Sequence, residues 1–422
     1  MAGNQSMFLK NVTLVAAGTA LAQVITIVAT PAVTRIYGPE AFGLLGVFSA
    51  VLSIVTPLSA FSYPIAIVLP KDDNEALDIA KLSLIIALAT SIIAFLFLIL
   101  FGEWLVSIFN IQEIYSYIYM IPFAMFFTAL LAVVSQWIIR NKFFLTKSKV
   151  AVFNSILINL SKIGLGLAFP VAGLLVFITA LNSMTHSVLL LIKLSRDNTK
   201  REISKTSKQT YVRILKRYQD FFLYRTPQVF LNALSQSLPV IMLTSLFSVS
   251  AAGYYSLAKL ALGAPSALLG EAVSSVFYPK FNETYRENNG YVKLFTKATL
   301  MLAVIGVVPF GIVVIFGDSL FSYIFGAEWD IAGQYAQWLS FWLYFSFMNR
   351  PSVAAIPVLS MQRTFLNYEI ISVTLRLSSM LAGYYLFDSG VIAIALFSII
   401  GAFLNISLIL MVFVNMNKTK AI

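Results

Sequence analysis

The chain contains twelve apolar segments that are each long enough to cross a membrane as a helix. A helix needs about 20 mostly apolar residues to span a hydrocarbon layer of about 30 Å. Only 11% of the 422 residues are charged and 59% are apolar, whereas soluble domains carry about 25% charged residues. We therefore predict an all-α polytopic membrane protein with about 12 transmembrane helices. The expected spans cover residues 11–35, 41–69, 79–101, 115–139, 150–170, 172–193, 220–247, 251–278, 294–316, 331–358, 364–387 and 390–414.

The distribution of Lys and Arg predicts the orientation of the spans, because cytoplasmic loops carry an excess of basic residues. Nine basic residues lie between Lys193 and Arg217, after the sixth span, and the other connections after even-numbered spans are also basic. Connections after odd-numbered spans are acidic, and Arg35 is almost their only basic residue. We therefore expect both termini in the cytoplasm. The net charge of +11 follows mostly from this bias. It points to anionic membrane lipids rather than to nucleic acid.

The polar connection 194–219 divides the chain into two similar parts. Gly43 precedes Pro70 by 27 residues in the first part, and Gly253 precedes Pro279 by 26 residues in the second. Six spans on each side give both parts the same orientation, as in the parallel repeats of transporters with a central site. We predict an N-terminal six-helix lobe at 1–193, a cytoplasmic basic linker at 194–219 and a C-terminal six-helix lobe at 220–422.

Several spans carry a polar stripe at helical spacing. Arg225, Gln228 and Asn232 share one face of the seventh span, and Lys259 belongs to a stripe on the eighth. Gln23 lies on a similar stripe in the first span. A charge near the bilayer centre costs at least about 2.5–3.5 kcal/mol, so Lys259 must face protein or a water-filled cavity. Close packing of small residues explains the Gly and Ser residues of these stripes, but it does not explain the lysine.

The composition excludes several kinds of chemistry. The chain has no cysteine and one histidine, His186, which excludes disulfides, thiol catalysis and Cys- or His-rich metal sites. The sequence shows no pair of carboxylates, Ser-His-Asp set or Gly-rich phosphate loop in segments that could arrange it as an active site. We therefore expect neither an enzyme nor a bound cofactor.

Three motifs carry a family resemblance. Two of them, in the second half, read Ala251-Ala-Gly-Tyr-Tyr-Ser-Leu-Ala-Lys259 and Pro265-Ser-Ala-Leu-Leu-Gly270-Glu-Ala-Val. With Arg35-Ile-Tyr-Gly-Pro-Glu-Ala-Phe-Gly43 in the first half, they resemble the signatures of Wzx-type lipid-linked oligosaccharide flippases. These flippases belong to the MOP superfamily, alongside the MATE drug exporters and the lipid II flippases. Family members usually carry an Arg where this chain has Lys259. The lysine keeps the positive charge of the arginine but lacks its bidentate geometry.

The resemblance covers nearly the whole chain and implies two six-helix lobes arranged as a V. The first, second, seventh and eighth spans would line its lumen. The implied function is a flippase of the bacterial inner membrane. It would move an undecaprenyl-pyrophosphate-linked saccharide from the cytoplasmic to the periplasmic leaflet by alternating access, for surface polysaccharides such as O-antigen and lipopolysaccharide. Membrane lipids and other polysaccharide-assembly proteins are the further partners implied.

A pyrophosphate head is anionic, and fixed cations in a wet lumen would compensate its charge. The expected substrate-binding residues are Lys259, Arg225, Asn232, Gln228, Gln23, Lys162 and Arg376. Arg35, near the periplasmic end of its span, is the expected gate. The alternatives for Lys259 are a structural ion pair or a side chain that snorkels to the interface.

Glu271 is the clearest carboxylate deep within the seventh and eighth spans, at a depth similar to that of Arg225. We expect the two residues to pair. Separating them would favour protonation of the carboxylate, so Glu271 is a candidate for coupling protons, or sodium, to alternating access. A static pair that holds two helices together is the alternative.

Two other classes of function remain open. A MATE-like drug or cation antiporter would favour acidic residues in the lumen, whereas the candidates here are mainly basic. A membrane enzyme of polysaccharide assembly would usually carry catalytic residues on a large extracytoplasmic loop, and every outer loop of this chain is short.

The predicted orientation can be tested with single cysteines, because the chain has none of its own. A membrane-impermeant thiol reagent applied to intact cells should label Ser319→Cys and leave Ser204→Cys unlabelled. The opposite pattern would place the basic connection outside the cell and invert the topology.

Overall fold

The computed structural model of the protein describes residues 2–109, 111–196, 208–287 and 289–420, with side chains at 17–109, 111–195, 209–263, 277–287 and 289–417. The described residues form helices and short connections, with no strand among them. This confirms the all-α class. Ten of the described helices are long and apolar enough to cross a membrane. The two other expected spans, the eighth and the tenth, fall on α10 and on α12 with α13.

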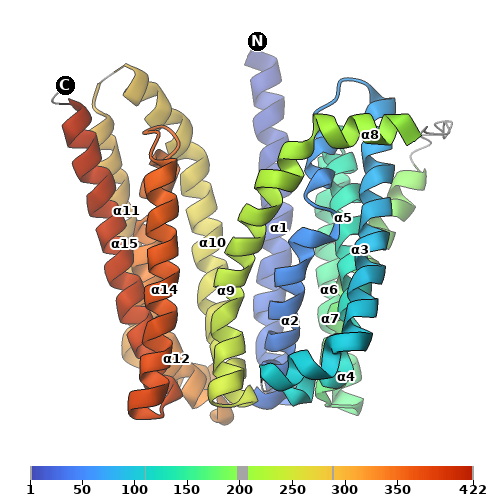
Figure 1. Ribbon diagram of the computed structural model, residues 1–422. Helices are drawn as coiled ribbons and strands as arrows, with labels where there is room; N and C mark the ends of the chain where they lie inside the picture. The colour runs from blue at the N-terminus through green and yellow to red at the C-terminus, as the bar shows by residue number, and fades with distance from the viewer. Residues whose placement is uncertain (1, 110, 197–207, 288, 421–422) are drawn as a thin grey trace. The chain divides into compact units, whose positions relative to one another are not determined.

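The chain forms two compact units, Met1–Ser245 and Leu246–Ile422. The elements of the first unit are α1 (Ala2–Ile36), α2 (Pro39–Ser59), η1 (Tyr63–Val68), α3 (Asp73–Ile108), η2 (Gln112–Ile114), α4 (Tyr115–Ile118), α5 (Ile121–Arg140), α6 (Phe144–Ala168), α7 (Ala172–Arg196), α8 (Lys208–Arg217), η3 (Phe221–Arg225) and α9 (Thr226–Leu246) (Figure 1). The elements of the second unit are α10 (Val249–Arg286), α11 (Tyr291–Phe325), η4 (Ala327–Trp329), α12 (Asp330–Met348), α13 (Arg350–Ala355), α14 (Gln362–Phe387) and α15 (Gly390–Lys420).

The boundary between the compact units lies later in the chain than the boundary between the predicted lobes. Nearly all of α9 groups with the first unit, because the start of this segment packs on η1. The Thr226 hydroxyl, for example, lies 3.2 Å from the Ser62 hydroxyl. The predicted lobes describe a duplication in the sequence rather than a grouping of contacts, and that division stays a prediction.

Two expected spans are interrupted. The second ends as α2 at Ser59, because Phe61 and Ser62 take positive φ angles of 46° and 59°, which a right-handed helix does not allow. Thr90 of α3 donates a hydrogen bond to the Ser59 carbonyl at 2.6 Å, so the helix end is satisfied. The tenth span divides at Asn349, and Pro351 follows as the second residue of α13. A proline disfavours helical geometry in the residue before it and lacks the N–H that a continuing helix needs.

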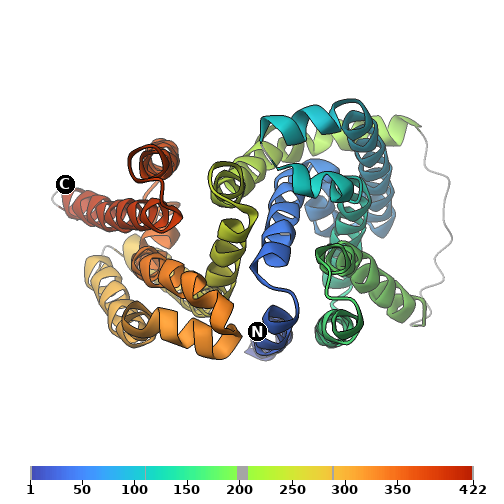
Figure 2. The same cartoon turned by 90° about the horizontal axis from the view of Figure 1, so that it is seen from below.

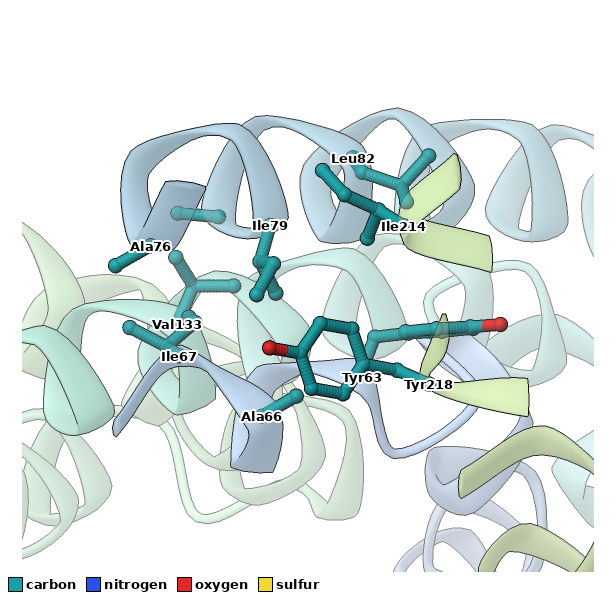
Figure 3. Close-up of a cluster of buried hydrophobic side chains, with 10 residues drawn as sticks. Tyr63, Ala66, Ile67, Ala76, Ile79, Leu82, Val133, Ile214 and Tyr218 are labelled. Atoms are coloured by element: carbon teal, nitrogen blue, oxygen red, sulfur yellow. The ribbon is translucent and has the colours of Figure 1, made fainter. Parts of the chain in front are cut away.

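Part of the predicted linker is folded onto the first unit. The helix α8 places Ile214 against α3, and Tyr218 follows directly after the helix (Figure 3). Ile79 of α3, Val133 of α5 and Tyr63 of η1 complete this buried cluster. Arg217 strengthens the contact through an ion pair with Glu75 of α3 at 2.8 Å. The end of the linker is therefore an amphipathic helix that belongs to the first unit.

Small residues bring the helices of the second unit close together. A Cβ atom at Gly383 of α14 would lie 2.4 Å from the Cα atom of Ala393 on α15, and one at Gly333 of α12 would lie 2.4 Å from the Cα atom of Asp318 on α11. These glycines let backbones approach closely, as small residues do in membrane helix interfaces. The helices α14 and α15 accordingly run side by side (Figures 1 and 2).

The guanidinium of Arg140, the last residue of α5, holds the connection between η1 and α3. Its Nε and Nη2 atoms donate to Oδ1 of Asp73 at 3.0 and 2.9 Å. Its Nη1 atom donates to the carbonyls of Ile67 and Pro70 at 3.1 and 2.6 Å, and Nη2 also reaches the Lys71 carbonyl at 3.3 Å. The Arg140 side chain is only 11% exposed, so water cannot readily replace these bonds.

We predict that Arg140→Lys lowers the thermal unfolding midpoint of the purified protein. Lysine keeps the charge but lacks the planar fork that serves several acceptors at once. Losing hydrogen bonds to a charged group costs on the order of 1.5–3 kcal/mol. Arg286→Lys, at an exposed position in the last turn of α10, is the matched control and should leave the midpoint unchanged. Equal midpoints for both variants would contradict the role assigned to Arg140.

Candidate functional site

Lys259 lies on α10 in the second unit and covers an aromatic ring. Its Nζ atom lies 5.8 Å from the centroid of the Tyr255 ring, one turn earlier on the same helix. The Tyr255 side chain is fully buried. A cation above the face of an aromatic ring is attracted by the negative face of the π system. Lys259 and Tyr255 therefore form a cation–π pair on α10.

Arg376 of α14 lies between two aromatic rings from neighbouring helices. Its Cζ atom is 5.4 Å from the Trp342 ring of α12 and 5.8 Å from the Phe397 ring of α15. The two rings meet edge to face at 5.1 Å, and the Nε atom donates to the Ser372 carbonyl at 3.2 Å. Guanidinium groups suit such sites, because they are planar and more weakly hydrated than an ammonium.

The two cations belong to one electrostatic cluster. Lys259 and Arg376 are close enough for their charges to repel each other. Glu369, two turns before Arg376 on α14, supplies the negative charge that attracts the guanidinium. These three groups together carry one net positive charge when all are ionised. Arg376 thus interacts electrostatically with a second cation, Lys259, and with an acid, Glu369.

Hydroxyl groups add to the polar character of this region. The hydroxyls of Tyr255 and Ser256 are buried and have no hydrogen-bond partner among the described residues. A buried polar group without a partner costs about 1–3 kcal/mol. Both hydroxyls lie on α10, the helix that carries Lys259.

Two other predicted site residues lie on α1 and α6 of the first unit. Lys162 of α6 is half-buried, and its backbone carbonyl accepts a hydrogen bond from the Tyr37 hydroxyl at 3.0 Å. Asn159, one turn earlier, donates to the Thr26 hydroxyl of α1 at 3.2 Å. Gln23 lies one turn before Thr26, and its Oε1 atom is buried without a hydrogen-bond donor among the described residues. The structure thus builds a polar seam between α1 and α6, with Lys162 and Gln23 on these two helices.

The residues predicted on the seventh span are exposed; Arg225 ends η3, and Gln228 and Asn232 lie on α9. The Nη1 atom of Arg225 donates to Oε1 of Gln228 at 3.0 Å, and Asn232 follows one turn later on an exposed position. Arg35 is exposed in the last turn of α1. The Glu271 side chain lies outside the described residues, so its pairing with Arg225 stays a prediction.

The sequence analysis missed the surroundings of Arg376. Glu369 is seven residues away on the same helix, so its place on the same face as Arg376 was readable from the helical period. Trp342 and Phe397 come from two other spans, and nothing in their spacing connects them to Arg376. The aromatic cage required the tertiary structure.

Comparisons with known proteins bear on the whole chain. A family model described as "Polysaccharide biosynthesis protein" matches residues 32–334. No curated protein matches the chain in sequence.

Solved structures of similar fold include an inward-facing multidrug resistance MATE family transporter of the MOP superfamily. It has 15% identity and a TM-score of 0.72, over 94% of this chain and 96% of that one. The lipid II flippase MurJ, in an inward closed conformation, has 14% identity and a TM-score of 0.65, over 97% and 91%. A MOP superfamily transporter from Pyrococcus furiosus has 16% identity and a TM-score of 0.58, over 98% and 96%. At these identities the similarity shows a shared fold. Together with the family match, it confirms the resemblance read from the motifs.

We predict that Arg376→Gln destabilises the protein more than the double variant Arg376→Gln/Glu369→Gln. Removing the arginine alone leaves Glu369 without its nearest attracting cation, whereas the double variant removes both charges. The expected difference is on the order of 1–3 kcal/mol, seen as a lower thermal unfolding midpoint in detergent. Arg363→Gln, at an exposed position in the first turn of α14, is the control. Equal midpoints for the single and double variants would show that the two charges do not interact.

Proposed function

The chain belongs to the polysaccharide biosynthesis protein family, and we propose that it serves this process as a flippase for lipid-linked oligosaccharides. The substrate is an oligosaccharide unit on undecaprenyl pyrophosphate. It moves from the cytoplasmic to the periplasmic leaflet of the bacterial inner membrane, for O-antigen or a similar surface polysaccharide. Both termini of the flippase lie in the cytoplasm, and no chemical bond of the substrate changes. The protein alternates between states open to each side.

The cluster of Lys259 and Arg376 carries this proposal. Lys259 lies about 15 Å along α10 from its first residue, and Arg376 lies near the middle of α14. Charges at such depth are costly in a bilayer and mark substrate or ion pathways. A pyrophosphate head that crosses the membrane needs cationic partners, which this cluster supplies as a lysine point charge and an arginine fork.

The other predicted residues have assigned roles in the proposal. The phosphates and sugar hydroxyls contact Lys162 and Gln23 of the first unit during passage. They also contact Arg225, at the end of η3, and Gln228 and Asn232 of α9. Arg35 acts as a gate at the periplasmic side. Glu271 couples transport to a proton or sodium gradient.

The carboxylate of Glu369 is the observation that favours a second candidate function, a MATE-like exporter of cationic drugs. A half-buried carboxylate in the second unit is the group that a cationic drug would seek. The Arg376 guanidinium already attracts this carboxylate, however, and Arg376 lies near a second cation, Lys259. This arrangement disfavours a cationic substrate. The flippase is therefore the better supported function.

The proposal predicts that a deletion strain accumulates lipid-linked saccharide on the cytoplasmic leaflet, and that the intact gene restores its export. Lys259→Ala should lower the affinity for the substrate roughly ten- to a hundredfold, because a lost contact to a charged group costs on the order of 1.5–3 kcal/mol. Export at ordinary expression should then fail, whereas Lys259→Arg should retain much of it. Surface glycan and membrane protein levels are measured together in all strains.

Two outcomes would contradict the proposal. Full export by a normally expressed Lys259→Ala variant would remove Lys259 from the site. Drug sensitivity of the deletion strain without any glycan defect would favour the drug exporter instead.

A further inference from the structure

A groove of about 400 Å³ lies in the first unit between η1, α3 and the segment from α8 to η3. Phe61, Ile86, Phe222 and Leu223 contribute to its wall, which is almost wholly apolar, and Lys216 and Gln219 also line it. Its volume falls within the range of about 300–1,000 Å³ that is usual for ligand pockets. None of its lining residues belongs to the cluster around Lys259 and Arg376.

Contacts between side chains and backbone hold the walls of the groove together. The rings of Phe61 and Phe222 meet edge to face at 4.9 Å, and the Tyr63 hydroxyl donates to the Leu215 carbonyl at 3.4 Å. The buried cluster of Figure 3 holds α8 against α3 beside the groove. The segment Phe221–Arg225 forms a single π-helical turn, a geometry that is frequent at functional sites.

The groove extends from the polar connection into the level of the hydrocarbon layer. Lys216 lies in α8, which precedes the membrane span Phe221–Leu246. Ile86 lies roughly 20 Å along α3 from its first residue. Phe222 and Leu223 are about half exposed, as are Ile85 and Leu88 beside Ile86 on α3. The groove is therefore continuous with the apolar surface that α3 presents to lipid.

We propose that this groove binds an anionic phospholipid of the surrounding bilayer. An acyl chain lies along Ile86, Phe222 and Leu223, and the phosphate lies at Lys216. Every charged residue of α8, whose sequence is KQTYVRILKR, is basic. A basic segment next to a membrane span attracts anionic headgroups by about 1 kcal/mol per residue, and a zwitterionic headgroup lacks the net charge for this attraction.

Mass action favours a phospholipid over the proposed transport substrate as the occupant. One lysine and a shallow apolar wall give a weak site, which fills only when the ligand is abundant. Phospholipids make up the bilayer itself, whereas a lipid-linked intermediate is a minor component. This inference does not depend on the proposed flippase function.

Native mass spectrometry of the full-length protein in neutral detergent tests the site. Dioleoyl phosphatidylglycerol is titrated as the anionic lipid, with dioleoyl phosphatidylcholine as the zwitterionic reference. The wild type should bind the anionic lipid in preference. Lys216→Glu should bind it roughly five- to twentyfold more weakly, because the variant replaces attraction by repulsion.

Two further variants separate the groove from general electrostatics. Arg213→Glu makes the same charge change on an exposed position of α8 that does not line the groove, and it should reduce binding clearly less than Lys216→Glu does. Leu223→Trp places a larger side chain into the groove from an exposed position. It should abolish the preferred binding while the lipid-free protein still unfolds in one cooperative transition.

Three results would overturn the proposal. Equal affinity for the two lipids would remove the headgroup selectivity. An equal loss in Arg213→Glu and Lys216→Glu would show a diffuse electrostatic effect. Displacement of the bound phospholipid by an equimolar polyprenyl phosphate would assign the groove to the transported lipid instead. Leu223→Trp keeps the test decisive if Lys216→Glu does not fold.

Discussion

The structure depends on a constraint that hydrocarbon imposes on the backbone. No water is present there to pair with N–H and C=O groups, so each group needs a partner inside the protein. Continuous helices satisfy this demand, and any break must be satisfied by a side chain. The break after α2 follows this rule, because Thr90 donates to the Ser59 carbonyl. Arg140 then donates to the carbonyls of Ile67 and Pro70 beyond η1. The interruption that creates η1 is therefore stable, and η1 in turn forms one wall of the lipid groove.

Intramembrane charge is the second constraint, and it links the fold to the function. An isolated cation at the middle of a span is costly, but Arg376 contacts two aromatic faces and is attracted by Glu369. These contacts stabilise the arginine without neutralising the whole cluster, because Lys259 adds a second positive charge. In the proposed flippase, Arg376 and Lys259 are the cations of the second unit that contact an anionic head group.

The sequence predicted the helices well, because their signal is local. Each expected span falls on helical segments, and the depth and charge of Lys259 and Arg376 could be read from the sequence, whereas their role in binding stays a prediction. The left-handed residues Phe61 and Ser62 were not predictable, since neither type favours a positive φ. The cage around Arg376 was not predictable either, because its rings come from separate spans. The docking of α8 did leave a signal. Tyr211, Ile214 and Tyr218 recur at spacings of three and four, but the basic composition of the connection concealed this amphipathic pattern.

The basic residues of the connections after even-numbered spans consequently have more than one role. The bias that orients the spans requires only positive charge, at whatever position within the loop. Arg140 and Arg217 are more specific, since each forms an ion pair with an acid near the start of α3. Their positions hold η1 and α8 against the first unit, and this arrangement places Lys216 at the groove. Neighbouring cations of the same loops thus serve the predicted orientation of the spans, the structure of the loops and the proposed binding of an anionic phospholipid. Substitutions among these cations should therefore differ in effect although they change the net charge equally.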